Sequence, residues 1–217
     1  MTDSITQFRE SGYTNLKGII PQDICNIVTQ YALLQEQVLP KKEDETGQVP
    51  NAHSIYSDTL METLMSFMKP YMEQHTGLEL FPTYSYYRVY RPGMVLERHT
   101  DRPSCEVSTT ICFGYNYQNT DPDYKWSMHV DPSYRHSAET DFVSQNNPGN
   151  AVPQDPGDII IYKGCEIEHW RDAFDAGEGS WQVQAFFHYI NKDGPYYPEY
   201  AFDRRPGLGW GSNIHLR

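Results

Sequence analysis

The stretch "PGDIIIYKGCEIEHW", residues 156–170, decides the fold that this sequence predicts. A Pro-Gly turn leads into the apolar run Ile159–Tyr162, and Gly164 marks a second turn before the chain extends toward His169. A short apolar run between turn residues is typical of a buried strand. We therefore expect two consecutive strands here, joined by the turn at Gly164.

Strand-like segments also lie on both sides of this stretch. Each is rich in β-branched or aromatic residues, as strands are. The segments are residues 80–90 (LFPTYSYYRVY), 105–117 (CEVSTTICFGYNY), 124–130 (YKWSMHV) and 180–190 (SWQVQAFFHYI). Residues 131–156 are polar and contain Pro, Gly and Asn, so we predict mostly loop there.

Before residue 78 the apolar residues instead recur at helical spacing. After a short strand-like stretch, a helix is predicted over residues 21–39, and a second one, capped by Asp58, over residues 58–76. The polar segment 40–51 is expected to be an exposed loop, and Pro70 is expected to kink or divide the second helix. The predicted apolar faces are Ile24, Ile27, Val28, Tyr31 and Leu34 in the first helix, and Leu60, Leu64, Phe67 and Met68 in the second.

Together these elements predict a mainly β protein with N-terminal helices, in a single domain over residues 1–217. We expect a helical brace over about residues 1–77, a β core over about 78–192 and an irregular tail over 193–217. Two helices followed by at least six strands fit a β-sandwich or barrel.

The composition limits the classes of partner. Asp and Glu number 29 against 17 Lys and Arg, which gives a net charge of −12 and a pI near 5.0. Such a balance argues against binding nucleic acid or an anionic membrane over a broad surface. The N-terminus lacks a signal-peptide pattern, and no apolar run reaches the roughly 18 residues of a membrane span. The four cysteines form no CxxC pair, so we expect a cytoplasmic protein with free thiols.

His99 and Asp101 are the residues most suggestive of chemistry. On an extended backbone, alternate side chains share a face, so this imidazole and this carboxylate could bind one metal ion. Two histidines and a carboxylate on one face of Fe(II) form the site of non-haem iron oxygenases. His169, at the end of the stretch 156–170, is the best candidate for the third ligand. His129 and His188, also in strand-like segments, remain alternatives.

The motifs around these residues resemble the 2-oxoglutarate- and Fe(II)-dependent oxygenase superfamily, in particular its prolyl-4-hydroxylase-like branch. A "YRPG" turn precedes "HTD", and "PGD" precedes the strand that leads to the distal histidine. The residues that match in order are Tyr90, Gly93, His99, Asp101 and His169. The resemblance covers about residues 84–190. It implies a double-stranded β-helix, or jelly roll, whose catalytic metal ligands are His99, Asp101 and His169.

The resemblance also implies a reaction. Fe(II) would be the metal and 2-oxoglutarate the co-substrate, and dioxygen would be used to hydroxylate an unactivated C–H bond with release of succinate and CO2. A small molecule or a peptidyl side chain would be the substrate. Because Asp101 is a carboxylate, hydroxylation is favoured over halogenation.

The sequence departs from the family at the co-substrate anchor. The family usually places an Arg or Lys shortly after the distal histidine, where this chain has Gly, Ser and Trp at residues 179–181. Arg171 is the first candidate to replace it because it shares a strand face with His169, Arg88 is the second and Arg102 the third. The residues that could add hydrogen bonds to the co-substrate are Tyr90, Ser108 and Thr110.

Two other functions stay open at this point. A cupin-like enzyme that uses iron, manganese or zinc without 2-oxoglutarate would account for the missing anchor. A non-enzymatic jelly-roll binding protein would leave the histidines incidental, although such a protein has no need of all three ligands. Cys165 is expected to be a buried free thiol and not a ligand, because a turn separates it from His169.

Overall fold

The computed structural model describes residues 3–39 and 48–211. Its α-helices are α1 (Ser4–Ser11), α2 (Gln22–Val38) and α3 (Thr59–Thr76), and its 3-10 helices are η1 (Pro103–Cys105) and η2 (Ala201–Arg204). The strands are β1 (Tyr13–Leu16), β2 (His53–Tyr56), β3 (Leu80–Tyr90), β4 (Leu96–His99), β5 (Val107–Asn116), β6 (Met128–Asp131), β7 (Asn150–Val152), β8 (Ile159–Tyr162), β9 (Glu168–Arg171) and β10 (Trp181–Asn191).

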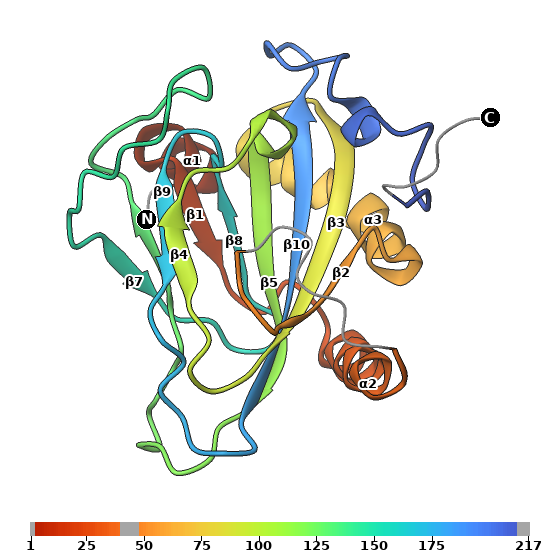
Figure 1. The fold of residues 1–217 in the computed structure, drawn as a ribbon. Coiled ribbons are helices and arrows are strands. Elements are labelled where there is room, and N and C mark those ends of the chain that lie inside the picture. The colour runs from red at the N-terminus through yellow and green to blue at the C-terminus, as the bar shows by residue number, and fades with distance from the viewer. Residues whose placement is uncertain (1–2, 40–47, 212–217) are drawn as a thin grey trace.

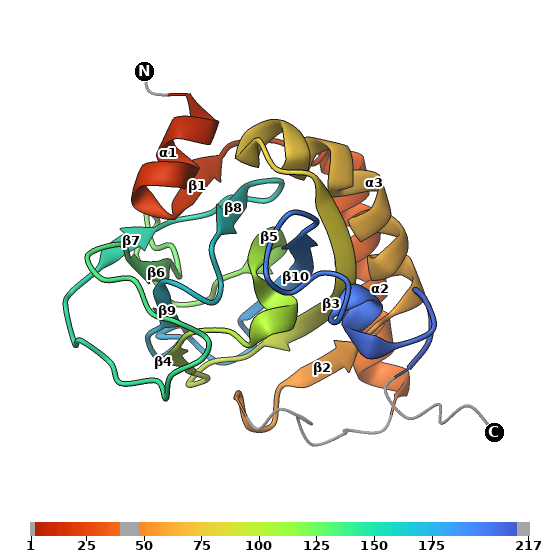
Figure 2. The same ribbon diagram turned by 90° about the horizontal axis from the view of Figure 1, so that it is seen from above.

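The strands form two antiparallel sheets that lie face to face (Figures 1 and 2). The larger sheet has the order β1-β8-β5-β10-β3-β2 and the smaller one β4-β9-β6-β7. The two strands predicted over residues 156–170 are present as β8 and β9, and the turn at Gly164 carries the chain from the larger sheet to the smaller. This double-stranded β-helix confirms the predicted fold class.

Helices α2 and α3 cover the outer face of the larger sheet (Figure 2). Side chains of β3 therefore alternate between two environments. Tyr87 and Val89 belong to the apolar core under the helices, whereas Tyr84, Tyr86 and Tyr90 lie between the two sheets. The strand is thus buried on both faces, and its inward row leads into the space where the site is found.

The predicted apolar faces of the two helices were partly wrong. In α3 the core is contacted by Met61, Met65, Met68 and Met72, whereas Phe67 is 64% exposed. The core face of α2 consists of Cys25, Val28 and Ala32, and its exposed residues include Ile27 and Leu34. Both helices carry apolar residues on adjoining faces. The spacing of apolar residues alone therefore does not decide which face packs against the core. Pro70 does not divide the second helix, because α3 continues through it.

Several short elements were not predicted. They are α1, β2 and β7, and β7 lies within the stretch 131–156, which is otherwise mostly loop as predicted. Residues 40–47 of the predicted exposed loop and residues 212–217 of the predicted tail lie outside the described residues. In the described ranges, none of the helices combines the length and the apolar character required to cross a membrane.

The start of α3 supports a stability prediction. The Asp58 carboxylate accepts a hydrogen bond from the Met61 amide at 3.1 Å and another from the Tyr31 hydroxyl at 2.6 Å. Replacing Asp58 with alanine should therefore lower the free energy of unfolding, measured in urea, by about 1 kcal/mol or more. Asp23→Ala, in the first turn of α2 where no side chain caps the helix, is the control. Equal losses in both variants would show that the cap contributes nothing specific.

Candidate metal centre

Strands β4 and β9 are neighbours in the smaller sheet, and their register pairs His99 with His169. The "YRPG" turn makes this possible by reversing the chain between β3 and β4. Gly93 in that turn has a φ of 82°, a conformation that favours glycine, and its amide donates to the carbonyl oxygen of Phe174 at 2.9 Å. Asp101 follows two residues after the end of β4.

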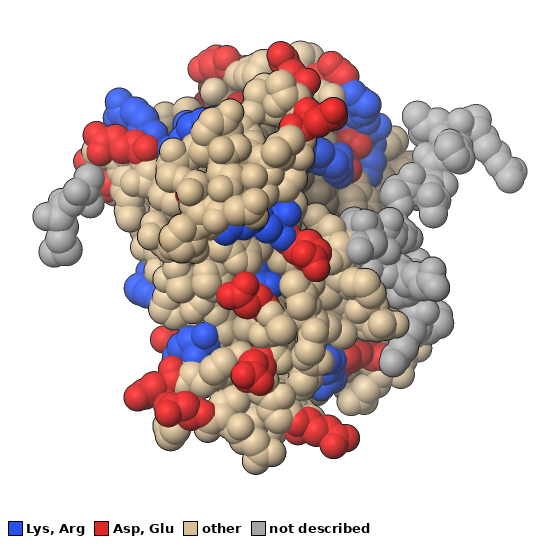
Figure 3. Space-filling view, turned by 60° about the vertical axis from the view of Figure 1, so that its left-hand side comes forward, with Lys and Arg blue, Asp and Glu red and all other residues tan. Residues whose placement is uncertain are grey.

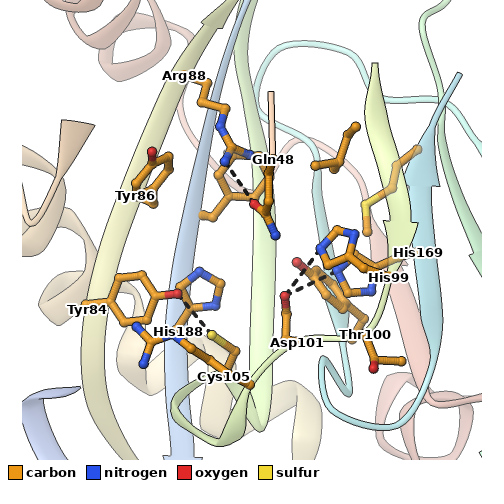
Figure 4. Close-up of a pocket in the computed structure, with 15 residues that line it drawn as sticks. Gln48, Tyr84, Tyr86, Arg88, His99, Thr100, Asp101, Cys105, His169 and His188 are labelled. Carbon is orange, nitrogen blue, oxygen red and sulfur yellow. Dashed lines mark hydrogen bonds and ion pairs between the residues drawn. The ribbon is translucent and has the colours of Figure 1, made fainter. Parts of the chain in front are cut away.

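Asp101 completes a compact group with the two histidines (Figure 4). Its Oδ1 atom lies 3.6 Å from Nε2 of His99 and 3.5 Å from Nε2 of His169. The two imidazole ring centroids are 4.3 Å apart. Two imidazole nitrogens and one carboxylate oxygen at this spacing can coordinate a single divalent cation.

Backbone carbonyls orient both imidazole rings. Nδ1 of His99 lies 2.6 Å from the Glu97 carbonyl oxygen, and Nδ1 of His169 lies 3.0 Å from that of Ile167. A carbonyl only accepts, so each Nδ1 carries a proton, and each Nε2 faces Asp101. In the neutral ring, Nε2 is then the nitrogen that can bind a metal ion.

The charge states also suit a cation. Burial alone would raise the pKa of Asp101, but His169 and His99 hold it well below its usual range. Burial lowers the pKa of His99, and the neighbouring His169 lowers it further. At neutral pH the group therefore contains an ionised carboxylate beside a neutral His99, which are the forms that bind metal.

The turn between β8 and β9 fixes Asp101. The backbone amide of Asp101 donates to the carbonyl oxygen of Gly164 at 2.8 Å. A Cβ atom at position 164 would lie only 2.4 Å from Oδ2 of Asp101, so glycine is required for this close approach. The Ser108 hydroxyl donates to the same Oδ2 at 3.2 Å. Oδ1 therefore faces the histidines, while Oδ2 is held from the other side.

A cavity of about 280 Å³ opens at these residues. Tyr84, Tyr86 and Arg88 reach it from β3, across from the histidines (Figure 4). The Arg88 guanidinium donates to Oε1 of Gln48 at 2.9 Å and lies 4.7 Å from the ring centroid of Tyr86. The alternation of side chains along β3 could have placed its three residues on one face, whereas no sequence signal marked Gln48.

Arg171, the first candidate for the co-substrate anchor, is fully buried and does not line this cavity. It donates to the carbonyl oxygen of Trp126 at 2.7 Å and to Oε1 of Gln154 at 3.0 Å. Within residues 3–39 and 48–211, no carboxylate pairs with it, and its Nε atom has no hydrogen-bond partner. The hydroxyl of Tyr90 is also buried without a partner in that part of the chain, and both side chains lie against the Trp126 ring.

The other sequence candidates are distributed around the site. Arg102 lines the cavity, but its guanidinium forms two hydrogen bonds with Asp203, at 2.5 and 2.7 Å. His129 is not part of the group and approaches Asp172 instead, at 3.2 Å. Cys165 is a buried free thiol. Thr110 accepts a hydrogen bond from Gln184 at 2.6 Å.

His188 lies in the cavity wall on the far side of Asp101 from the other two histidines (Figure 4). Its Nδ1 atom is 2.8 Å from the Ser108 hydroxyl, and burial lowers its pKa to about 4. Beside it, the thiol of Cys105 lies 3.1 Å from the hydroxyl of Tyr84. Sequence reasoning named His188 only as an alternative ligand and did not identify Cys105, which precedes β5 without any recognisable motif.

Solved structures with the same architecture are found among oxygenases. A prolyl-4-hydroxylase of Pseudomonas putida is 14% identical, with a TM-score of 0.56, and the match covers 85% of this chain and 96% of that one. HygX of Streptomyces hygroscopicus, solved with nickel and 2-oxoglutarate, is 12% identical, with a TM-score of 0.59 and coverage of 89% and 88%. The epimerase SnoN, solved with Fe3+, alpha ketoglutarate and nogalamycin RO, is 12% identical, with a TM-score of 0.63 and coverage of 94% and 90%.

The sequence itself matches no protein-family model and no curated protein sequence. At these identities the structural likeness concerns the fold. The chain has the jelly-roll fold of the 2-oxoglutarate- and Fe(II)-dependent oxygenases.

Proposed function

We propose that this protein is a non-haem Fe(II)- and 2-oxoglutarate-dependent dioxygenase that hydroxylates an unactivated C–H bond and releases succinate and CO2. The observation that carries the proposal is the group His99, Asp101 and His169 at the cavity. Structures of the same fold that hold a metal ion together with 2-oxoglutarate support it.

The donor set fits Fe(II). Two imidazole nitrogens and one carboxylate leave the cavity side of a bound ion open, as non-haem iron oxygenases require. When bound, iron and 2-oxoglutarate would together supply the reductive activation of dioxygen. The protein contributes the orientation of the ligands, through the carbonyls of Glu97 and Ile167 and the turn at Gly164.

A buried guanidinium in the interior of the barrel supports binding of a dicarboxylate. A fully buried guanidinium is costly unless an anion pairs with it, and Arg171 has no carboxylate partner among the described residues. Its Nε atom and the Tyr90 hydroxyl are both available as donors there. We therefore assign the distal carboxylate of 2-oxoglutarate to Arg171, with Tyr90 as a second donor. Arg88, which the cavity reaches directly, is the alternative anchor.

The remaining cavity wall would receive the substrate. Tyr84, Tyr86 and Phe186 supply aromatic surface, and Arg88 supplies a charge-assisted donor. A cavity of about 280 Å³ suits a small molecule or a single peptidyl side chain beside dioxygen.

Charge and cysteine chemistry support the expected partners and location. On the face drawn in Figure 3, Lys and Arg side chains are interspersed with acidic ones and do not form one continuous patch. With a net charge of −12, this disfavours a nucleic acid substrate. All four cysteines are free and buried, which supports a reducing, cytoplasmic location.

Turnover of the co-substrate tests the proposal without knowledge of the substrate. Purified protein with Fe(II), 2-oxoglutarate and oxygen should release succinate slowly by uncoupled turnover, and omitting Fe(II) should abolish the release. A protein that binds iron but releases no succinate, with or without candidate substrates, would instead favour a cupin-like enzyme that does not use 2-oxoglutarate. A protein without metal binding would favour a jelly-roll binding protein.

A further inference from the structure

A second group of metal-binding side chains shares Asp101 with the first. Asp101, Cys105 and His188 each offer one ligand atom, and these three atoms all lie within 4.8 Å of one another. Cys105 is 1% exposed and His188 is 5% exposed, so both are held in a buried wall and not on a mobile surface. In Figure 4, Asp101 lies between this pair and the two histidines of the first group.

The two groups approach Asp101 from different sides. Oδ1 faces His99 and His169, at 3.6 and 3.5 Å. Oδ2 faces Ser108, whose hydroxyl also lies 2.8 Å from Nδ1 of His188. Asp101 thus faces the first group through Oδ1, and the Ser108 hydroxyl bridges its Oδ2 to Nδ1 of His188.

The ligand types distinguish the second group from the first. It contains a thiol, and thiolate together with imidazole and carboxylate suits Zn2+, whereas the first group has only nitrogen and oxygen donors. The Tyr84 hydroxyl, 3.1 Å from Sγ of Cys105, is positioned to donate to a metal-bound thiolate. Binding would release the thiol proton through the adjoining cavity, which Cys105 and His188 both line.

We propose that Asp101, Cys105 and His188 form a second cation site for Zn2+, whose occupation opposes Fe(II) binding at the adjacent group. Two divalent ions that compete for one carboxylate repel each other at short range. Zn2+ therefore acts as an inhibitor through this site. The existence of the site is independent of the proposed function, and only its inhibitory effect depends on that function.

Cobalt(II) tests the site directly, because thiolate coordination gives it intense near-ultraviolet charge-transfer absorption that nitrogen and oxygen ligands do not give. Metal-free protein should develop this absorption by two equivalents of Co2+. Cys105→Ser should abolish it, and His188→Gln should weaken Co2+ binding at this site at least tenfold. Cys165→Ser removes a buried thiol outside the group and should leave the absorption unchanged.

No thiolate absorption at two equivalents, or absorption that persists in Cys105→Ser, would overturn the site. The inhibitory effect is measured separately, as the Zn2+ concentration that halves succinate release. We expect it to rise at least tenfold in Cys105→Ser relative to the unmodified protein. Equal inhibition in both would place the inhibiting Zn2+ at His99, Asp101 and His169 and overturn the coupling. Because the cobalt spectrum needs neither Fe(II) nor 2-oxoglutarate, it stands even if the proposed function fails.

Discussion

Replacing His169 with alanine is expected to reduce Fe(II)- and 2-oxoglutarate-dependent succinate release by more than about a hundredfold. Loss of an outer partner of a metal ligand typically costs about 10–100-fold, and loss of a ligand itself should cost more. His169 is buried, and its Nε2 lies 3.5 Å from Asp101, so its loss removes one of the three donors of the group. Initial rates and iron content of the purified variant would measure both effects.

His129→Ala is the matched control for this variant. His129 lies on β6, the strand next to β9, and stacks on Trp170 at a centroid distance of 5.1 Å, outside the metal group. The His129→Ala variant should retain iron binding and succinate release within about twofold, because His129 does not belong to that group. If His129→Ala lost iron while His169→Ala retained it, the ligand assignment would be wrong.

Replacing Arg171 with glutamine should weaken 2-oxoglutarate binding by about 30- to 1,000-fold while iron still binds. Removing one partner of a buried charge pair costs about 2–4 kcal/mol, and each 1.4 kcal/mol is about a factor of ten. Arg171→Lys keeps the charge but loses the planar guanidinium that contacts Trp126 and Gln154. Its affinity for 2-oxoglutarate should therefore lie between that of Arg171→Gln and that of the unmodified protein. Anaerobic titration of the iron-loaded variants with 2-oxoglutarate measures the dissociation constants.

Arg88→Gln separates the two candidate anchors. Arg88 lines the cavity beside Gln48, so its loss should leave 2-oxoglutarate affinity within about threefold if Arg171 is the anchor. A large loss of 2-oxoglutarate affinity in Arg88→Gln, with none in Arg171→Gln, would show that Arg88 on β3 is the anchor. Thermal unfolding of each variant distinguishes lost affinity from a destabilised fold.

The strands and the approach of His99 to Asp101 were predictable because their signals are local. The run Ile159–Tyr162 between turn residues gives β8, and the spacing of His99 and Asp101 follows from the alternation of extended chain. The third residue of the group, His169, required only one further histidine on a neighbouring strand. These predictions depend on the alternation of side chains in strands and on the Pro and Gly residues that mark turns, and both can be read from the sequence.

The helix faces and the cavity wall depend on contacts that the sequence does not display. Phe67 is exposed because the methionine face of α3 is the one that meets the sheet, a choice made by packing and not by helical spacing. Cys105 reaches Tyr84, 21 residues away, only after β3 and η1 come together. Similarly, Arg171 could be named as a candidate anchor, but its lack of a carboxylate partner follows from tertiary packing.

Anaerobic absorption of the protein with Fe(II) and 2-oxoglutarate tests the central claim most directly. Chelation of iron by the keto acid at His99, Asp101 and His169 should produce a weak visible charge-transfer band that saturates at one equivalent of each. The same mixture with His99→Ala should show no band. A protein that binds one equivalent of Fe(II) yet shows no band with saturating 2-oxoglutarate would contradict the account.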